Sequence, residues 1–236
     1  MISLAVFDMA GTTIDDGGAV YEALRRAVEE TGVSVADEDL QTWMGAEKRA
    51  AITALIELGG GEPAQPAHRV DDAFARFREI LAELYTATPP MPIAGVPEAI
   101  AALQQQGVKV ALTTGFSRDI AEPILRSLGW AVAGEPEAAA ANLVVDALSC
   151  GDEVAQGRPA PFMIHRVMER TGVIDTGAVL VAGDTVVDVQ AGANSGAAIT
   201  IGVLSGKLGS DAFTGQPHTA LLGSVAEIPA YLGSPA

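Results

Sequence analysis

The apolar residues of this chain follow two patterns that alternate along its length. Short unbroken apolar runs are typical of strands that are covered on both faces, whereas apolar residues three or four positions apart predict amphipathic helices. Strand-like runs that alternate with helical segments predict a parallel, doubly wound α/β sheet. The strand-like runs lie at residues 4–7, 108–112, 143–145, 178–182 and 198–201, and the helical segments of the same region lie at 96–106, 117–128, 161–170, 186–193 and 225–232.

Residues 16–88 carry only the helical pattern, with segments at 19–31, 47–58 and 70–85 and a helix start near 35–39. This block interrupts the α/β pattern directly after the first strand. The sequence therefore predicts a Rossmann-like core formed by residues 1–15 and 90–236, with an all-helical domain of residues 16–89 inserted into it. We expect such an insertion to act as a lid that excludes water from the carboxyl end of the first strand.

Composition and charge narrow the classes of partner. The chain has 236 residues, 49% of them hydrophobic, and a formal net charge of −16, which argues against nucleic acid and anionic membranes as partners. The single cysteine, Cys150, cannot form an intrachain disulfide and is compatible with a reducing compartment. Because we find neither a signal-peptide pattern nor an apolar run of spanning length, we expect a cytoplasmic protein.

Side chains that could carry chemistry follow four of the predicted strands. The carboxyl ends of parallel strands meet at one edge of a sheet, where open α/β sheets bind their ligands. We therefore expect these side chains to converge on one site. They are Asp8 and Thr12 after the first strand, Thr114 and Gly115 after the second, Arg158 beyond the third, and Asp184 and Asp188 after the fourth.

Together these side chains predict a site for a phosphoryl group. Asp8, Asp184 and Asp188 supply the hard oxygen ligands that Mg²⁺ prefers, and Thr114 and Arg158 can hold phosphate oxygens. A carboxylate beside a metal-held phosphorus atom can attack it, which makes Asp8 the candidate nucleophile of an aspartyl-phosphate intermediate. Taken singly, Asp184 is better explained as a helix N-cap and Asp188 as a solvated helix position.

Four segments resemble, in order and spacing, the four motifs of the haloacid dehalogenase superfamily. They are Asp8-Met9-Ala10-Gly11-Thr12-Thr13, Thr114, Gly157-Arg158-Pro159 and Gly183-Asp184-Thr185-x-x-Asp188. The resemblance covers essentially the whole chain and implies Mg²⁺-dependent phosphoryl transfer in a Rossmann-like core with a helical lid. It assigns Asp8, Ala10, Asp184 and Asp188 to the metal and Thr12, Thr114, Gly115 and Arg158 to the phosphate.

At two positions the chain departs from most members of that superfamily and resembles one branch of it, the phosphonoacetaldehyde hydrolases or phosphonatases. Most phosphatases of the superfamily carry a second aspartate, the general acid, at the position of Ala10, and a lysine at the position of Arg158. The phosphonatases lack that acid and have a lid lysine after a Met-Gly pair, which this chain matches with Met44, Gly45 and Lys48. The resemblance implies that Met44, Gly45 and Phe116 contact substrate. Ala51 and Phe116 stand where that family has a histidine and a tyrosine.

The missing acid and the lysine belong to one mechanism. Cleavage of a C–P bond expels carbon, and an imine formed between Lys48 and a carbonyl two atoms from phosphorus turns the leaving group into an enamine. No alkoxide then needs a proton, so an acid at position 10 is unnecessary. A lysine on a helix is ordinarily a solvated cation, but this chain has only three lysines against eleven arginines.

The sequence thus predicts hydrolysis of phosphonoacetaldehyde or a related 2-oxoalkylphosphonate, a small anionic substrate. A phosphomonoesterase of the same superfamily is the first alternative, and an aspartyl-phosphate receiver module without catalysis is the second. Glu47, Tyr21 or an ordered water could move the proton of Lys48. The related phosphonatases form dimers, which makes a homodimer the expected assembly.

Overall fold

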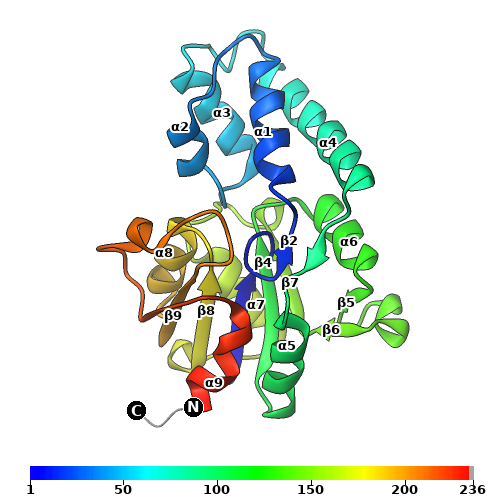
Figure 1. The fold of residues 1–236 in the computed structure, drawn as a ribbon, viewed down its shortest axis with the longest axis vertical. Coiled ribbons are helices and arrows are strands. Elements are labelled where there is room, and N and C mark those ends of the chain that lie inside the picture. Colours follow the sequence, from blue (N-terminus) through cyan, green and yellow to red (C-terminus); the bar gives the residue numbers. More distant parts are fainter. Residues whose placement is uncertain (234–236) are drawn as a thin grey trace. The chain divides into compact units, whose positions relative to one another are not determined.

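The computed structural model of the protein describes residues 1–233 and divides the chain into two compact units. The core unit begins with Met1–Asp15 and resumes at Met91, and the helical unit is Asp16–Pro90. The domain boundaries predicted from the sequence lie within one residue of these two crossings. Each unit is described in turn, and Figure 1 labels their elements.

Six parallel strands form the main sheet of the core unit. The first strand, β1, lies at its centre, with β4 on one side and β8 on the other, so the order of the strands reverses at the end of β1. Ligands bind at such switch points of open α/β sheets. In spatial order the strands are β10 (Ala220–Leu222), β9 (Ile199–Val203), β8 (Val179–Gly183), β1 (Leu4–Asp8), β4 (Lys109–Thr114) and β7 (Ala147–Cys150).

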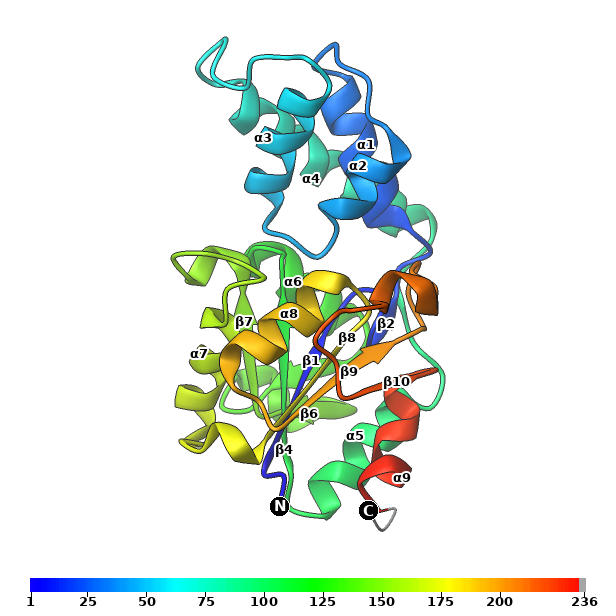
Figure 2. The ribbon, with the colours of Figure 1, turned by 90° about the vertical axis from the view of Figure 1, so that its left-hand side faces the viewer.

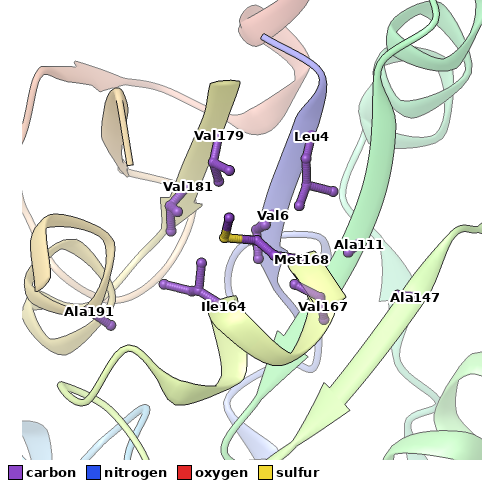
Figure 3. Close-up of a cluster of buried hydrophobic side chains, with 10 residues drawn as sticks. All are labelled: Leu4, Val6, Ala111, Ala147, Ile164, Val167, Met168, Val179, Val181 and Ala191. Carbon is purple, nitrogen blue, oxygen red and sulfur yellow. The ribbon is translucent and has the colours of Figure 1, made fainter. Parts of the chain in front are cut away.

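Helices cover both faces of this sheet, which explains why β1 is an unbroken apolar run whose five residues are all buried. On one face, α7 (Phe162–Thr171) and α8 (Val186–Ser195) pack against the strands. α5 (Val96–Gln105) and α9 (Ile228–Gly233) lie on the other face (Figure 2). Figure 3 shows the cluster of buried side chains that α7, α8 and the strands form together, which are Leu4, Val6, Ala111, Ala147, Ile164, Val167, Met168, Val179, Val181 and Ala191.

Smaller elements complete the core unit. Two short strands, β2 (Ile14–Asp15) and β3 (Met91–Pro92), pair antiparallel where the chain leaves the core unit and returns to it. A separate parallel pair is formed by β5 (Trp130–Val132) and β6 (Leu143–Val145). The remaining elements are α6 (Arg118–Ser127) and the 3-10 helices η1 (Pro136–Ala140), η2 (Gly151–Glu153), η3 (Thr176–Ala178), η4 (Ser210–Phe213) and η5 (Val225–Glu227).

One predicted strand belongs to a different sheet. Residues 143–145 form β6 in the two-stranded sheet, and the main-sheet strand is β7, two residues further along. Between them, Asp146 exchanges hydrogen bonds with Val110 of β4: its amide donates to the Val110 carbonyl at 2.7 Å, and its carboxylate accepts from the Val110 amide at 2.8 Å. This residue therefore separates the two strands.

The helical unit contains four helices and no strand among its residues, as the sequence predicts. Their apolar faces pack together around buried residues such as Leu24, Ile52 and Phe77. In the described part of the chain, no helix of either unit combines the length and the apolar character of a membrane span. The four helices are α1 (Ala19–Glu29), α2 (Asp37–Thr42), α3 (Lys48–Leu58) and α4 (Arg69–Ala87).

Candidate active site

The turn after β1 fixes the position of Asp8. The carbonyl of Met9 accepts hydrogen bonds from the amides of Thr12, Thr13 and Ile14 at 3.2, 2.8 and 2.9 Å. The Thr13 hydroxyl also donates to the Asp8 carbonyl at 3.0 Å. These bonds close a tight loop directly after the strand, so the backbone that carries the Asp8 carboxylate is rigid.

Arg158 lies against two of the three predicted aspartates. Its Nη1 atom is 2.7 Å from Oδ1 of Asp8 and 2.9 Å from Oδ1 of Asp188. All three side chains are almost completely buried. Arg158 is therefore not a surface cation, although an arginine in a loop ordinarily is one.

Asp188 contacts both Arg158 and the N-cap residue of α8. Its Oδ2 atom accepts from the amide of Thr185 at 3.0 Å and from the Thr185 hydroxyl, which forms a capping box with Thr185 as the N-cap. Its other oxygen faces Arg158. Asp188 is therefore not a solvated helix position, and Thr185 rather than Asp184 is the N-cap of α8.

Asp184 is enclosed by the turn after β1 and by a loop that follows β9. The Thr12 hydroxyl donates to its Oδ1 atom at 2.9 Å. Gly11 has φ +87°, and a Cβ atom there would lie 2.4 Å from Oδ2 of Asp184. A Cβ atom at Gly206 would lie only 1.9 Å from the same oxygen. Both positions therefore need glycine. Gly206 belongs to none of the four motifs, so its role does not show in the sequence.

Asp8 and Asp184 have raised pKa values, and burial is the main cause for both. Burial raises the pKa of Asp8 to about 6, since the nearby Arg158 opposes the shift only in part and Asp188 adds to it. For Asp184, burial and the charges of Asp8 and Asp188 hold the pKa well above its ordinary range. Burial opposes the charge of Arg158, but the carboxylates of Asp188 and Asp8 outweigh this effect and raise its pKa.

The three aspartates fit a divalent cation. They offer oxygen atoms that all lie within 4.8 Å of one another, and each side chain is buried. Three carboxylates with only one guanidinium among them have an excess of negative charge, and hard oxygen donors of this kind suit Mg²⁺. Ala10, which the resemblance also assigned to the metal, could contribute only its backbone carbonyl.

The residues predicted to hold phosphate lie at the end of β4 and in the loop after it. Thr114 is buried, and its hydroxyl accepts from the amide of Phe116 at 3.2 Å across Gly115. Thr113, one residue earlier, pairs with Asp8 in the register of β4 and β1. The structure thus brings this strand end beside Asp8. The side chain of Phe116 is buried as well.

Lys48 begins α3 in the helical unit and is only 3% exposed. Its ammonium nitrogen donates to the carbonyl of Ala46 at 3.0 Å. Met44 is also buried, and Gly45 has φ +78°, a value that favours glycine. Lys48 is therefore not the solvated cation that a lysine on a helix ordinarily is.

Glu47 has a structural task next to this lysine. Its two carboxylate oxygens accept from the amides of Arg49 at 2.9 Å and Ala50 at 2.8 Å, which makes Glu47 the N-cap of α3. Both oxygens are thus engaged by the helix that carries Lys48. Ala51, at the position of the family's histidine, is fully buried in α3 and has no group that could move a proton.

Comparisons with known proteins agree with this geometry. A protein from Bacillus cereus named phosphonoacetaldehyde hydrolase is 31% identical over 216 residues, which cover 87% of this chain and 76% of the relative. A hydrolase from Pseudomonas syringae superposes with a TM-score of 0.82 at 17% identity and covers 98% of both chains. A phosphonoacetaldehyde hydrolase-like protein from Oleispira antarctica superposes with a TM-score of 0.79 at 20% identity, over 98% of this chain and 91% of that one.

The sequence profile of one family spans most of the chain. It matches residues 2–196, which include Asp8, Thr114, Arg158, Asp184 and Asp188. The motifs, the fold and the buried aspartates support membership of the same family. The chain therefore belongs to the haloacid dehalogenase-like hydrolases.

Proposed function

We propose that this hydrolase cleaves the C–P bond of phosphonoacetaldehyde or a related 2-oxoalkylphosphonate. The observation that carries the proposal is the buried amine of Lys48 at the first residue of α3. Buried lysines serve as Schiff-base nucleophiles because burial favours the neutral amine, the form that condenses with a carbonyl. The similarity to a protein named phosphonoacetaldehyde hydrolase supports the same substrate class.

The reaction begins at the carbonyl group of the substrate. The Nζ atom of Lys48 adds to this carbon, water leaves, and the resulting iminium withdraws electrons from the C–P bond. An oxygen of Asp8 then attacks phosphorus, and the electron pair of the broken C–P bond forms an enamine on Lys48. Protonation of the enamine carbon and hydrolysis of the imine release acetaldehyde and restore the lysine. A second water molecule hydrolyses the aspartyl-phosphate to phosphate.

The core residues prepare the attack by Asp8. The Arg158 guanidinium, which contacts Asp8 and Asp188, can also hold oxygens of the phosphonate group. The hydroxyl of Thr114 and the backbone around Gly115 complete the anion-binding side. A divalent cation bound by Asp8, Asp184 and Asp188 would reduce the repulsion between the nucleophile and its anionic substrate.

Ala10 distinguishes this reaction from ester hydrolysis. An ester substrate loses an alkoxide, which needs a proton from a general acid, and an alanine methyl group cannot supply one. An enamine leaves without that proton. The phosphomonoesterase alternative would use the same aspartates, Thr114 and Arg158, so Ala10, Lys48 and the substrate separate the two functions. A receiver module is disfavoured by the helical unit, which such modules do not need.

The test is release of phosphate by the purified chain with and without MgCl₂, from phosphonoacetaldehyde and from a panel of small phosphate esters. We expect Mg²⁺-dependent release from the phosphonate. Lys48→Ala and Lys48→Arg should each lower this release at least about a hundredfold, because both remove a covalent catalytic group. Lys109→Ala is the matched control, since this exposed lysine begins β4 at the opposite end of the strand from Thr114. Preference for esters, or full activity without Lys48, would contradict the proposal.

A further inference from the structure

The guanidinium of Arg158 is held at two different nitrogens. Nη1 faces Asp8 and Asp188, as described above, and Nη2 donates to the hydroxyl of Thr113 at 2.8 Å. The donor and the acceptor of this last bond are both buried, with Arg158 7% and Thr113 4% exposed. Neither the four motifs nor the mechanism above uses Thr113.

Thr113 is held firmly in this place. It lies in β4, between the central strand β1 and β7, and is the residue of β4 that pairs with Asp8. In a parallel sheet, paired residues project from the same face at the same level. The Thr113 hydroxyl and the Asp8 carboxylate are therefore carried by two hydrogen-bonded strands. This pairing fixes the distance between their backbones.

The hydroxyl adds a contact that the two carboxylates do not make. Asp8 and Asp188 both lie against Nη1, whereas the Thr113 hydroxyl accepts from Nη2. Contacts at two nitrogens orient the planar guanidinium more firmly than contacts at one. A lysine in place of Arg158 would offer one ammonium nitrogen with no second arm, so it could not use Thr113 in this way.

We propose that Thr113 is a positioning residue, which orients the Arg158 guanidinium toward the phosphate or phosphonate group that Asp8 attacks. The inference rests on the proposed function only to the extent that such a group binds beside Arg158. It holds equally for a C–P substrate and for a phosphate ester.

The variants follow from the shape of the side chain. Thr113→Val removes the hydroxyl and keeps the branched shape that suits a strand, while Thr113→Ser keeps the hydroxyl and loses the methyl group. Ser149→Ala is the control. Ser149 pairs with Thr113 on the neighbouring strand and is fully buried, and its hydroxyl has no hydrogen-bond partner among residues 1–233.

The experiment measures binding of inorganic phosphate to the full chain by calorimetry in MgCl₂, together with kcat and KM for phosphonoacetaldehyde, the proposed substrate. We expect Thr113→Val to weaken phosphate binding by about tenfold, because the bond it removes is to a charged group. KM should rise in parallel. Thr113→Ser should restore binding to within about twofold, and Ser149→Ala should leave it unchanged.

A double-mutant cycle with Arg158→Lys separates positioning from packing. If Thr113 acts through Arg158, Thr113→Val should have almost no further effect on phosphate binding in the Arg158→Lys background. An undiminished effect there, no effect in the original background, or no phosphate binding by the unaltered chain would overturn the inference. Thr113→Ala replaces Thr113→Val if the latter does not fold. If the unaltered chain binds phosphate but cleaves no oxo-phosphonate, the proposed function fails and this inference stands.

Discussion

At the residue scale, the burial of the Asp8 carboxylate lowers the stability of the folded protein when this group is ionised. The charged form of a buried carboxylate is costly unless its partners compensate fully. Arg158 compensates only in part, since the pKa of Asp8 remains at about 6, above its ordinary value of 3.8. The folded protein therefore holds the proton of Asp8 more tightly than the unfolded chain does.

The raised pKa of Asp8 makes the folded protein less stable as pH rises. Below pH 3.8 both states are protonated, and as pH rises from 3.8 to about 6 the unfolded chain ionises first and gains stability over the folded protein. Above this window the ionised Asp8 costs the folded state up to about 3 kcal/mol. Asp8→Asn keeps the shape and removes the charge, so we expect this variant to be more stable than the unaltered protein at pH 7 to 8.

Urea unfolding in EDTA over this pH range measures the effect. The stability gap between Asp8→Asn and the unaltered chain should open as pH rises from about 4 to about 6 and persist above that. A matched control is Asp119→Asn, which removes a carboxylate at the start of α6. A variant that is less stable than the unaltered chain at pH 8 would show that the ion pair with Arg158 outweighs the cost of burial.

At the element scale, α3 depends on the cap that Glu47 provides. Glu47 is one of three groups that could move the proton of Lys48, with Tyr21 and an ordered water as the others. Its carboxylate also accepts from the amides of Arg49 and Ala50. We expect Glu47→Ser to keep most of the activity, since serine is a good N-cap without a carboxylate, and Glu47→Ala to destabilise the start of α3 by about 1 kcal/mol.

Phosphate release from the oxo-phosphonate and circular dichroism of each variant distinguish the two roles of Glu47. A capping role predicts that Glu47→Ser remains active while Glu47→Ala loses both helical stability and activity. A proton-transfer role predicts that both variants fail, and that the acid limb of the pH–rate profile changes in each. Glu57→Ala at the far end of the same helix serves as the control, because this residue is exposed.

The elements differ in how readily the sequence reveals them. β1, β4, β8 and β9 are buried on both faces, so their apolar runs stand out. β7 was missed because Ala147-Leu148-Ser149-Cys150 is less apolar and β-branched than the Leu143-Val144-Val145 run beside it. Short β10, with three half-buried residues at the edge of the sheet, carries too weak a pattern to be seen.

The site was predictable where function requires a particular side chain. Asp8, Asp184 and Asp188 could be inferred because carboxylates at strand ends suggest a metal, and the structure does bring them together. Gly206 and Thr113 could not be inferred, because their importance depends on a close approach to Asp184 and on one hydrogen bond to Arg158. Only the folded structure specifies such contacts.

At the scale of the whole molecule, the proposed chemistry is divided between the two units. The nucleophile Asp8 and its partners belong to the core unit, whereas Lys48 belongs to the helical unit. The chain crosses between the units near residues 15 and 90, where β2 and β3 pair. In the proposed reaction, each unit thus supplies one of the two nucleophiles, Asp8 or Lys48. The lid role and a homodimer stay predictions.

This division predicts that the two halves can be separated by mutation. Imine formation needs the amine of Lys48 and the carbonyl of the substrate, but not the attack by Asp8. We expect borohydride, added with phosphonoacetaldehyde, to trap a two-carbon phosphonate adduct on Lys48 in Asp8→Asn, although this variant releases no phosphate. Lys48→Ala should form no adduct, yet it should still release phosphate slowly from an aryl phosphate, whose leaving group needs no acid. Peptide mass spectrometry locates the adduct, and its absence from Asp8→Asn, or its presence at Lys109 or Lys207 instead of Lys48, would contradict the proposed division of labour.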